Sequence, residues 1–455
     1  MSHIDNPVTV IGAGLAGSEA AWQLAARGIP VRLFEMRPET PSPAHHTGGF
    51  AELVCSNSLK SNDPETAPGL LKQELAALGS FVLACARATA VPAGGALAVD
   101  RGAFSDTITR ELLANPLIEV VRAEVDSIPA EGDVVVATGP LTSAAFEPAL
   151  SSLVGTDRLA FFDAAAPIIE ADSVDRAIAF SQSRYDKGEG ADYLNCPMNR
   201  EQYERFIEAL VGAQRVVLKE FESADLFQAC QPIEEIARRG GDALRFGPFK
   251  PVGLTDPSTG ERPWAVLQLR SENRAATAYN LVGCQTNLTF TEQKRVFGLI
   301  PGLADATFAR FGVMHRNTFV DAPRLLTNGL ALHVNPRIRL AGQIAGTEGY
   351  MEAAAAGLIA ALDIIAVRSG GVSPVLPTET ALGGLIAYAT DPETVRYQPM
   401  HVNFGLLPPS EVHTRGKRAR RAAIAERASR ALDTFAHEHR ELLAPAHDRL
   451  AGFTQ

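Results

Sequence analysis

A glycine-rich turn between a strand and a helix constrains this chain more than any other feature of its sequence. The turn lies within residues 6–38, NPVTVIGAGLAGSEAAWQLAARGIPVRLFEMRP. The apolar stretch 8–11 predicts a strand, a Gly-x-Gly-x-x-Gly turn then opens an alanine-rich helix, and a second strand at 31–34 leads to Glu35. This order of elements is typical of a parallel α/β sheet whose first turn binds a dinucleotide.

Each glycine of the turn has its own physical reason. Gly12 permits the tight turn, Gly14 lets a pyrophosphate approach the backbone, and Gly17 lets the helix pack closely against the strand. The free N–H groups at the start of the helix favour the negative charge of a diphosphate. Glu35 follows at the distance where an acid accepts hydrogen bonds from a ribose, which favours FAD or NAD over a 2′-phosphorylated ligand.

Two later segments favour FAD over NAD. GDVVVATG at 132–139 predicts a strand that ends in a turn, as a later sheet strand of a flavoprotein would. IRLAGQIAGTEGYMEAAAAGLIAALDII at 338–365 repeats the strand–glycine–helix plan, and its helix start would face the electron-rich edge of a flavin. The candidate cofactor contacts there are Gly342, Gln343 and Gly346. A tightly packed glycine/alanine helix would explain the same pattern without a cofactor.

The cofactor segments lie at opposite ends of the chain, which predicts a discontinuous lobe. The expected fold class is α/β, with a Rossmann-like FAD-binding lobe of the glutathione-reductase type and an inserted α+β lobe. We expect the FAD-binding lobe at 1–160 and 302–455, and the inserted substrate lobe at 161–301. Within the insertion, the amphipathic patterns NCPMNREQYERFIEALVGA and TFTEQKRVFGLI predict helices flanked by strands, and the Pro/Gly-rich stretch 246–264 predicts a loop.

Charge and cysteine content argue against several classes of protein. The net charge of -10 is a poor overall match to a polyanion, although a local basic patch can still bind one. The five cysteines are odd in number and have no C-x-x-C spacing, so neither a disulfide framework nor a zinc site is expected. His45-His46 has no carboxylate spaced to complete a metal site. No signal peptide is visible and Asp363 interrupts the most apolar stretch, so the cytoplasm is expected and a membrane span is not.

Two basic segments are candidates for contact with a polyanion. Residues 415–430 hold seven Lys or Arg against one acid on an expected helix. A second group contains Arg238, Arg239, Arg245 and Lys250. A solvated charged face explains the terminal segment equally well.

Six blocks of the sequence carry a recognisable pattern. They are IGAGLAGSEAAWQLAARGIPVRLFEMRP, PAHHTGGFAELVCSNSLKS, VPAGGALAVDRGAFS, CQPIEEIARRGGDALRFGPFKPVGL, GVMHRNTFV and LAGQIAGTEGYMEAAAAGLIA. Together they resemble the TrmFO family, the folate- and FAD-dependent tRNA (uracil-5-)-methyltransferases of bacteria. The resemblance runs from the N-terminus to NFGLLPP at 403–409.

The resemblance implies a complete reaction. A one-carbon unit from 5,10-methylenetetrahydrofolate reaches C5 of the T-loop uridine in tRNA, and flavin reduced by NAD(P)H makes it a methyl group. FAD is then the cofactor, folate and NAD(P)H are co-substrates, and the T-arm of tRNA is the partner that the inserted lobe would help to bind. No metal and no membrane are expected, and the resemblance is silent on protein partners.

The family's two functional cysteines map onto Cys55 in CSNSL and Cys230 in CQPIE. A thiolate that adds to C6 of uracil makes C5 nucleophilic, and Cys230 is our candidate for that thiolate. Arg238 and Arg239 would stabilise it, and Glu234 could relay a proton. Cys55 is expected beside the flavin, as an aid to one-carbon transfer or as an acid/base. Without the resemblance, a lone cysteine is more often inert packing, and that role is expected for Cys85, Cys196 and Cys284.

Other interpretations stay open at this point. Lys60 and His315-Arg316 could contact folate or a phosphate, or could simply be solvated. The related wobble-uridine modification enzymes share the downstream glycine pattern but are longer and open with a different glycine segment. A flavoprotein that binds RNA without methylating it is a further alternative, and both mapped cysteines argue against it.

Overall fold

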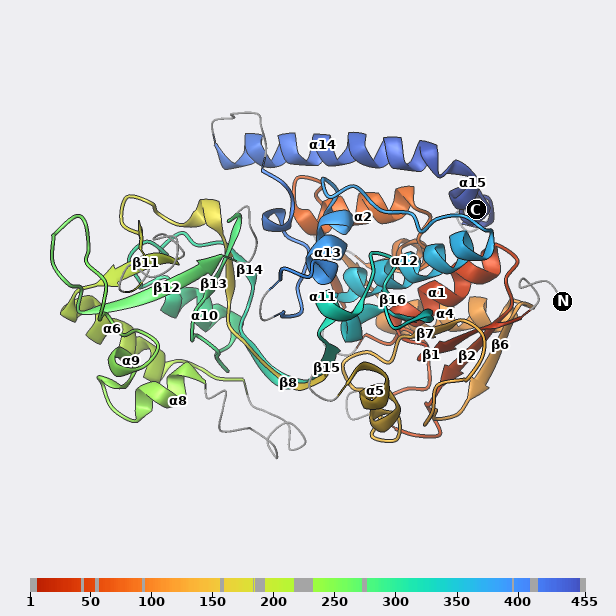
Figure 1. The fold of residues 1–455 in the computed structure, drawn as a ribbon, viewed down its shortest axis with the longest axis horizontal. Coiled ribbons are helices and arrows are strands. Elements are labelled where there is room, and N and C mark those ends of the chain that lie inside the picture. The colour runs from red at the N-terminus through yellow and green to blue at the C-terminus, as the bar shows by residue number, and fades with distance from the viewer. Residues whose placement is uncertain are drawn as a thin grey trace. The chain divides into compact units, whose positions relative to one another are not determined.

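A computed structural model describes the greater part of the chain. The described residues are 6–41, 45–53, 57–91, 95–155, 159–182, 184, 193–216, 232–271, 276–394, 397–409 and 416–450. They form two compact units: unit 1 holds Met1–Phe161 and Asn317–Gln455, and unit 2 holds Phe162–Arg316. The chain leaves unit 1 in β8 (Leu159–Ala165) and returns in β15 (Val313–Val320), and these two strands pair with each other (Figure 1).

Unit 1 is built on a six-stranded sheet. In order across the sheet, the strands are β16 (Ala331–Leu332), β17 (Asn335–Leu340), β7 (Val134–Val136), β1 (Val8–Ile11), β2 (Val31–Glu35) and β6 (Ile118–Arg122). Every neighbouring pair is parallel except β16 with β17. The first strand of the chain therefore lies inside the sheet, which is the doubly wound order of a dinucleotide-binding lobe. The α/β fold class and both strands of the first βαβ unit are confirmed.

Two helices from opposite ends of the chain pack tightly in unit 1. α1 (Leu15–Ala26) follows the first glycine turn and α12 (Tyr350–Arg368) follows the second. Their backbones approach so closely that a Cβ added to Gly357 would lie 2.1 Å from the carbonyl oxygen of Ala16. Among the described helices, α12 alone is long and apolar enough to cross a membrane, and 83% of its most apolar window is buried inside the protein.

The rest of unit 1 is largely helical. A small sheet has the order β3 (Ser58–Ser61), β5 (Ala96–Val99) and β4 (Ala90–Val91). The helices are α2 (Ala67–Ala77), α3 (Phe81–Ala88), α4 (Arg101–Ala114), α5 (Glu147–Val154), α11 (Ala322–Leu325), α13 (Ala381–Thr390), α14 (Lys417–Glu438) and α15 (Arg440–Leu450). Side chains that accept from the first turn fix several helix starts, namely Thr66 for α2, Ser80 for α3, Asp100 for α4 and Thr380 for α13.

Unit 2 has an antiparallel sheet with one apolar face. Its order is β10 (Phe180–Ser181), β11 (Tyr193–Met198), β12 (Ala265–Ser271), β13 (Ala278–Leu281), β9 (Ile168–Glu170) and β14 (Phe308–Arg310). The helices are α6 (Arg200–Gly212), α8 (Ile233–Arg238), α9 (Ala243–Phe246) and α10 (Phe290–Phe297). The core joins Leu194, Cys196, Leu267 and Leu269 of the sheet to Phe206 and Phe297 of the helices.

Most local expectations for the insertion agree with the structure. α6 and α10 form where amphipathic helices were predicted, and no helix or strand lies between α9 and β12, where the Pro/Gly-rich loop was expected. The compact unit continues to Arg316 rather than ending at 301. The reason is that β14 pairs with β9 and so belongs to the inserted sheet.

Candidate cofactor-binding site

The predicted cofactor residues lie at one edge of the unit 1 sheet. Gly12 follows β1, Glu35 ends β2, Ala137 follows β7 and Gly342 follows β17. Because these strands are parallel neighbours, their carboxyl ends meet at the same edge, which is where open α/β sheets bind ligands. The fold thus brings the two glycine segments together.

The three glycines of the first turn have separate geometric roles. Gly12 has a φ of +97°, and a Cβ there would lie 2.6 Å from the carbonyl oxygen of Ala137. A Cβ on Gly17 would lie 1.8 Å from the carbonyl oxygen of Gly12, so this glycine is required for packing of the helix on the strand. Around Gly14 nothing lies within 4 Å of such a Cβ. The open side at Gly14 is the one a diphosphate would approach.

Glu35 is buried and held in the ionised form. One carboxylate oxygen accepts a 3.0 Å hydrogen bond from the Ala13 N–H, and the other accepts from the Arg37 Nε at 2.8 Å. Burial alone would raise the pKa of Glu35, but the hydrogen bonds and charge of Arg37 outweigh burial and the pKa is lowered. The carboxylate is therefore ready to accept hydrogen bonds from ribose hydroxyls.

Arg37 was not among the predicted site residues. It is buried, and its guanidinium also contacts Glu52 at 3.1 Å and donates to the Thr47 carbonyl. It therefore ties the end of β2 to the loop that follows. The only signal in the sequence is its position two residues after the acid, and a charged residue after a strand is usually solvated.

The second glycine segment is crowded by protein. Gly342 has a φ of +83°, and a Cβ there would lie 2.9 Å from the Ala16 Cβ on α1. At Gly346, with a φ of +78°, a Cβ would lie 2.1 Å from the hydroxyl oxygen of Tyr397. Close packing thus accounts for both glycines by itself. Gln343 is half-buried between them on a short 3₁₀ turn.

Polar groups without protein partners fit a bound dinucleotide at this edge. The Thr347 hydroxyl is fully buried and has no hydrogen-bond partner in the described part of the chain. Neither Gly14 at the start of α1 nor Gly349 at the start of α12 caps its helix with a side chain. Gly139, after β7, has a φ of +69° and open space around it. Unsatisfied helix N–H groups and a buried hydroxyl suit phosphate and ring oxygens, so the residues fit the expected cofactor.

Lys60 belongs to an ionic cluster at the start of α12. Its ammonium donates to Glu352 at 3.1 Å and lies 2.9 Å from Nδ1 of His401. Burial would raise the pKa of Glu352, but the charges of Lys60 and His401 reverse the effect and the pKa is lowered. Lys60 is thus engaged with protein partners, and its expected contact with folate or phosphate stays a prediction.

The two candidate functional cysteines, Cys55 and Cys230, lie outside the described residues. The three cysteines that were expected to be structural are all buried as free thiols, namely Cys85, Cys196 and Cys284. Burial raises the pKa of all three thiols, that of Cys196 to about 12. These thiols stay protonated at neutral pH, as packing residues would.

Two residues expected to assist Cys230 have structural partners instead. Glu234 is buried and accepts from the Thr286 hydroxyl and the Asn287 N–H, each at 2.7 Å. Burial raises the pKa of Glu234. Arg238 donates to Glu235 at 2.8 Å on its own helix. Both residues therefore have hydrogen-bond or ionic partners within unit 2, and their expected roles beside Cys230 stay predictions.

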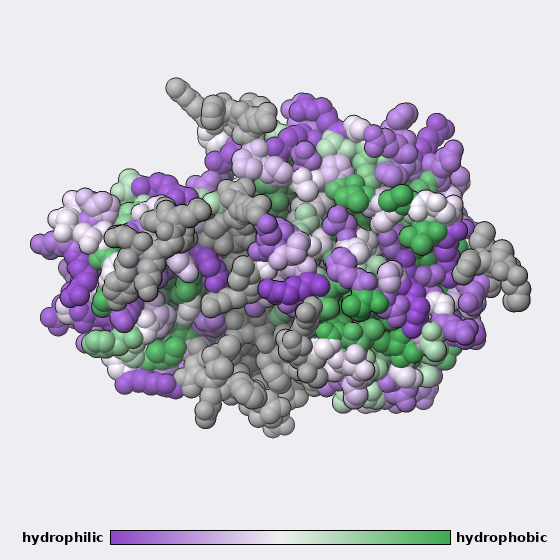
Figure 2. All heavy atoms as spheres, in the orientation of Figure 1, coloured by the Kyte–Doolittle hydropathy of each residue, from purple (hydrophilic) through white to green (hydrophobic). Residues whose placement is uncertain are grey.

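The terminal basic helix α14 is only partly free for a partner. Arg418 pairs with Glu65, Arg430 pairs with Glu426, and Arg427 donates to two proline carbonyls. The side chains of Arg418 and Arg430 remain 88% and 68% exposed, so both can still reach a phosphate. Figure 2 shows hydrophilic side chains along the upper edge of the view, where α14 lies.

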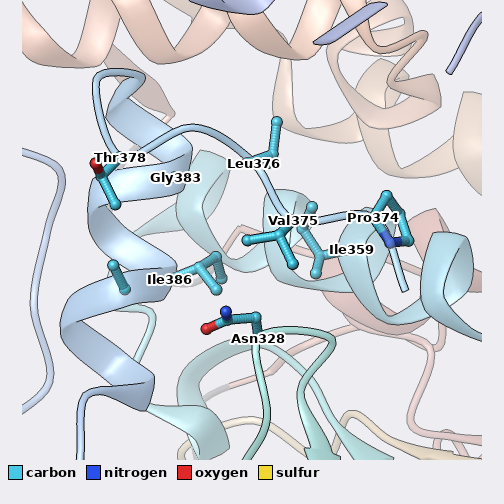
Figure 3. A pocket seen from close by; sticks show the side chains of 9 residues that line it. Asn328, Ile359, Pro374, Val375, Leu376, Thr378, Gly383 and Ile386 are labelled. Carbon is cyan, nitrogen blue, oxygen red and sulfur yellow. The ribbon is translucent and has the colours of Figure 1, made fainter. Parts of the chain in front are cut away.

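Two further features of the described residues bear on where a cofactor or metal could bind. Within the described ranges, no group of three or more His, Cys, Asp or Glu could hold a metal ion. A small cavity of about 40 Å³ opens between α12 and α13 beside Asn328, Ile359 and Ile386 (Figure 3). It has room for one or two waters and not for a dinucleotide.

Comparison with known proteins gives a consistent result. The family model described as glucose inhibited division protein A matches residues 7–370. The methylenetetrahydrofolate--tRNA-(uracil-5-)-methyltransferase TrmFO of Heliobacterium modesticaldum is 54% identical over 95% of this chain and 98% of its own length. The protein of the same name from Pelobacter propionicus is 55% identical over 92% of each chain. A solved structure of Aquifex aeolicus GidA has a TM-score of 0.49 at 16% identity, covering 98% of this chain and 78% of that one, a likeness that adds nothing to the assignment.

Proposed function

This chain belongs to the TrmFO family of folate-dependent tRNA (uracil-5-)-methyltransferases, and from that membership we propose its full reaction. It transfers the one-carbon unit of 5,10-methylenetetrahydrofolate to C5 of a uridine in the T loop of tRNA and releases 5-methyluridine. FAD is its cofactor, and NAD(P)H is the proposed source of electrons. The observation that carries the proposal is 54% identity over 95% of the chain to an enzyme of that name.

FAD would bind along the carboxyl edge of the unit 1 sheet. The backbone at Gly12 and Gly14 and the N–H groups of α1 would hold its diphosphate, while Glu35 would accept from the ribose. Gly342 and Gln343, at the start of η4 (Gly342–Ala345), are proposed to line the ring. Reduced flavin supplies the hydride that makes the transferred carbon a methyl group.

The thiol chemistry is proposed for the two mapped cysteines. The Cys230 thiolate would add to C6 of the target uracil, and the resulting enolate would attack the methylene carbon from C5. Loss of the C5 proton and of the one-carbon carrier would leave an exocyclic methylene on C5. Addition of the hydride to that carbon would then expel the Cys230 thiolate and restore the ring with its methyl group. Cys55 would act beside the flavin as the acid or base. A target base must leave its stack to meet these groups, and phosphate contacts elsewhere would orient the tRNA.

One assay tests the reaction directly. Purified protein with FAD, NADPH, unmodified tRNA and methylenetetrahydrofolate is expected to form 5-methyluridine, detected by nucleoside analysis. S-adenosylmethionine as the only donor is expected to give none. Cys230→Ala is expected to keep its FAD absorption spectrum and lose the product. A protein that binds FAD and tRNA but forms no 5-methyluridine under any of these conditions would refute the proposed methylation.

The alternative within the same fold is modification of a wobble uridine. Digestion of the product tRNA to oligonucleotides of known sequence distinguishes it, because the modified nucleoside would lie in the anticodon loop instead of the T loop. Identity to the TrmFO proteins along nearly their whole length favours the T loop.

A further inference from the structure

The sheet of unit 2 has a polar face opposite its apolar core. Side chains alternate between the faces of a strand, so residues paired across antiparallel strands share a face. Leu194 and Leu269 point into the core with their neighbours. The residues that alternate with the core residues along each strand point to the opposite face. On β11, β12 and β13 these include Asn195, Gln268 and Asn280. Nothing in the proposed function has used this face.

Three polar side chains form one row across the polar face. Tyr193 on β11 is paired with Arg270 on β12, and Arg270 is paired with Asn280 on β13. These three strands are neighbours in the sheet (Figure 1). Directly paired residues have Cβ atoms roughly 5 Å apart, so the three side chains leave the sheet next to one another on this face. The row continues to Ile168 on β9, which is fully buried.

Among the described residues the row has no protein partners, although Asn280 as a whole is only 7% exposed. In the described part of the chain, none of the side chains of Tyr193, Arg270 and Asn280 makes a hydrogen bond or ion pair. Neither amide atom of Asn280 is among the fully buried polar atoms that lack a partner, so the amide can be reached from outside the protein. The three side chains can therefore form hydrogen bonds with a bound molecule.

In the next row of the same face, by contrast, the polar side chains have hydrogen-bond partners within the protein. Gln268 donates to the Asn195 side chain at 3.0 Å and accepts from Arg184 at 2.8 Å. Asn195 also donates to backbone carbonyls, including that of Gln182 at 2.9 Å. The acid on this face, Glu170, has a partner of its own. Asn195 and Gln268 thus form a rigid floor beside the open row.

We propose that Tyr193, Arg270 and Asn280 bind an unpaired uridine nucleotide of the tRNA substrate. An amide carries one acceptor and one donor, which complement the N3–H and the C4 carbonyl of uracil. The guanidinium beside it suits the phosphate of the same nucleotide, and the phenol offers a ring for stacking. The inference rests on the proposed function, since it assumes a tRNA substrate.

A folate pterin presents a similar N–H and carbonyl edge, but a nucleotide fits the row better. The phosphate of a nucleotide is one ribose away from its base, so a guanidinium on the adjacent strand can reach it. The carboxylates of folate lie at the far end of a long side chain. The row therefore favours the nucleotide, and folate is the competing occupant in the test.

The decisive experiment combines a protein change with a base change. A fluorescent T-arm hairpin is prepared with either uridine or N3-methyluridine at the methylation position, and its affinity for the FAD-loaded full chain is measured by anisotropy. N3-methylation is expected to weaken binding to the unaltered protein about tenfold. Asn280→Ala is expected to bind the uridine hairpin about tenfold more weakly and to lose most of its discrimination against the methylated hairpin. If N3-methylation weakens binding to Asn280→Ala as much as it weakens binding to the unaltered protein, the two changes act independently. That result would overturn the assignment of Asn280 to the base edge.

A second variant tests the phosphate contact, with a matched control. Arg270→Met is expected to reduce the salt dependence of hairpin binding by about one charge. Arg262→Met removes an exposed arginine from a loop of the same unit and is expected to change the salt dependence much less. Equal slopes for the two variants would contradict the contact of Arg270 with a phosphate.

FAD content and thermal unfolding, measured on every variant, separate local effects from misfolding. If Asn280→Ala instead weakens folate binding and leaves the hairpin affinity unchanged, the row is a pterin site and the inference fails while the proposed methylation stands. If the unaltered protein neither binds the hairpin nor forms 5-methyluridine, the proposed function itself fails.

Discussion

Gly14 and Gly17 belong to the same turn but are under different steric constraints. A side chain at position 17 would collide with the backbone of Gly12 at 1.8 Å, whereas a side chain at position 14 meets nothing within 4 Å. Gly17 is therefore required by the fold, whereas the fold places no such demand on Gly14, for which we propose a role in binding the cofactor. One glycine motif thus contains two kinds of residue that only the structure separates.

Alanine at each position is expected to give opposite results. Gly17→Ala should lower the free energy of unfolding by about 1–3 kcal/mol or more, because neither backbone can yield easily. Gly14→Ala should change it by less than about 1 kcal/mol, since Gly14 has a φ of -70° that alanine adopts freely. The same Gly14→Ala variant should bind FAD more weakly. Urea unfolding and FAD titration of the flavin-free protein measure both effects. Normal FAD affinity in Gly14→Ala would argue against a diphosphate at this turn.

The stability of the protein is expected to depend on pH through the buried carboxyl group of Glu74. It is buried and accepts from the N–H groups of Ala381 and Leu382 at the start of α13. Burial raises the pKa of Glu74 from 4.5 to about 7. Because the folded state holds the proton more tightly, the contribution of Glu74 to stability is complete below pH 4.5 and is lost as the pH rises through about 7.

Glu74→Gln is expected to remove this pH dependence. Relative to the unaltered protein, the variant should gain stability between pH 4.5 and pH 8, by at most about 3 kcal/mol. Urea unfolding at several pH values measures the difference between the two proteins, so the titration of all other groups cancels. A difference that stays constant with pH would show that Glu74 does not titrate with a raised pKa.

At the scale of one element, α12 is an apolar helix that buries a charge. Asp363 interrupts its apolar sequence. Its carboxylate forms an ion pair with the Nε of Arg339 on β17 at 2.8 Å, and both side chains are 5% exposed or less. Arg339 also contacts Asp133, which pairs with Arg368. The network joins β17, the segment before β7 and the C-terminal half of α12. What reads in the sequence as a break in an apolar stretch is a point of attachment for the helix.

Removal of one charge from this network should be costly. Asp363→Ala is expected to lower the free energy of unfolding by about 3–5 kcal/mol, because Arg339 is left buried with an unpaired nitrogen. Replacing both residues, as Asp363→Leu with Arg339→Met, should recover much of the loss. Glu119→Ala is the control, since it breaks an exposed ion pair with Arg32 of the same 2.8 Å length and should cost less than about 1 kcal/mol. Equal losses in Asp363→Ala and Glu119→Ala would contradict the structural role of the buried pair.

At the scale of the whole molecule, the chain forms its cofactor unit from two distant parts. The first glycine segment precedes unit 2 in the sequence and the second follows it, yet β1, β7 and β17 are consecutive strands of one sheet. One cofactor should therefore stabilise both parts together. Unit 2 has its own sheet and its own apolar core.

Hydrogen exchange should record that division. FAD added to the flavin-free protein is expected to slow exchange at residues 12–18 and 342–352 together, because a ligand that binds only the folded state suppresses opening of its site. Exchange in β11 and β12 is expected to change little. Mass spectrometry of the peptides measures all four segments in one experiment. Protection confined to one glycine segment would show that the two do not form a common site.

The sequence by itself determined the features that depend on neighbours along the chain. The first βαβ unit, the amphipathic helices of the insertion and the Pro/Gly-rich loop follow from local periodicity and turn chemistry. The six family blocks also identified the reaction, because the motifs and their order along the chain can be recognised from the sequence without a structure. The end of the insertion was misplaced at 301, since the pairing of β14 with β9 joins residues that are remote in sequence.

Only the tertiary structure decided which charged and polar groups meet. Lys60, Glu352 and His401 come from three separate segments, and Tyr193, Arg270 and Asn280 from three strands. The local sequence around each of these residues does not predict which side chains lie next to it in the fold. The physical reason is that secondary structure is set mainly by short-range propensity and hydrophobic period, whereas a side chain's partners are set by which surfaces pack, and that is fixed only when distant segments come together.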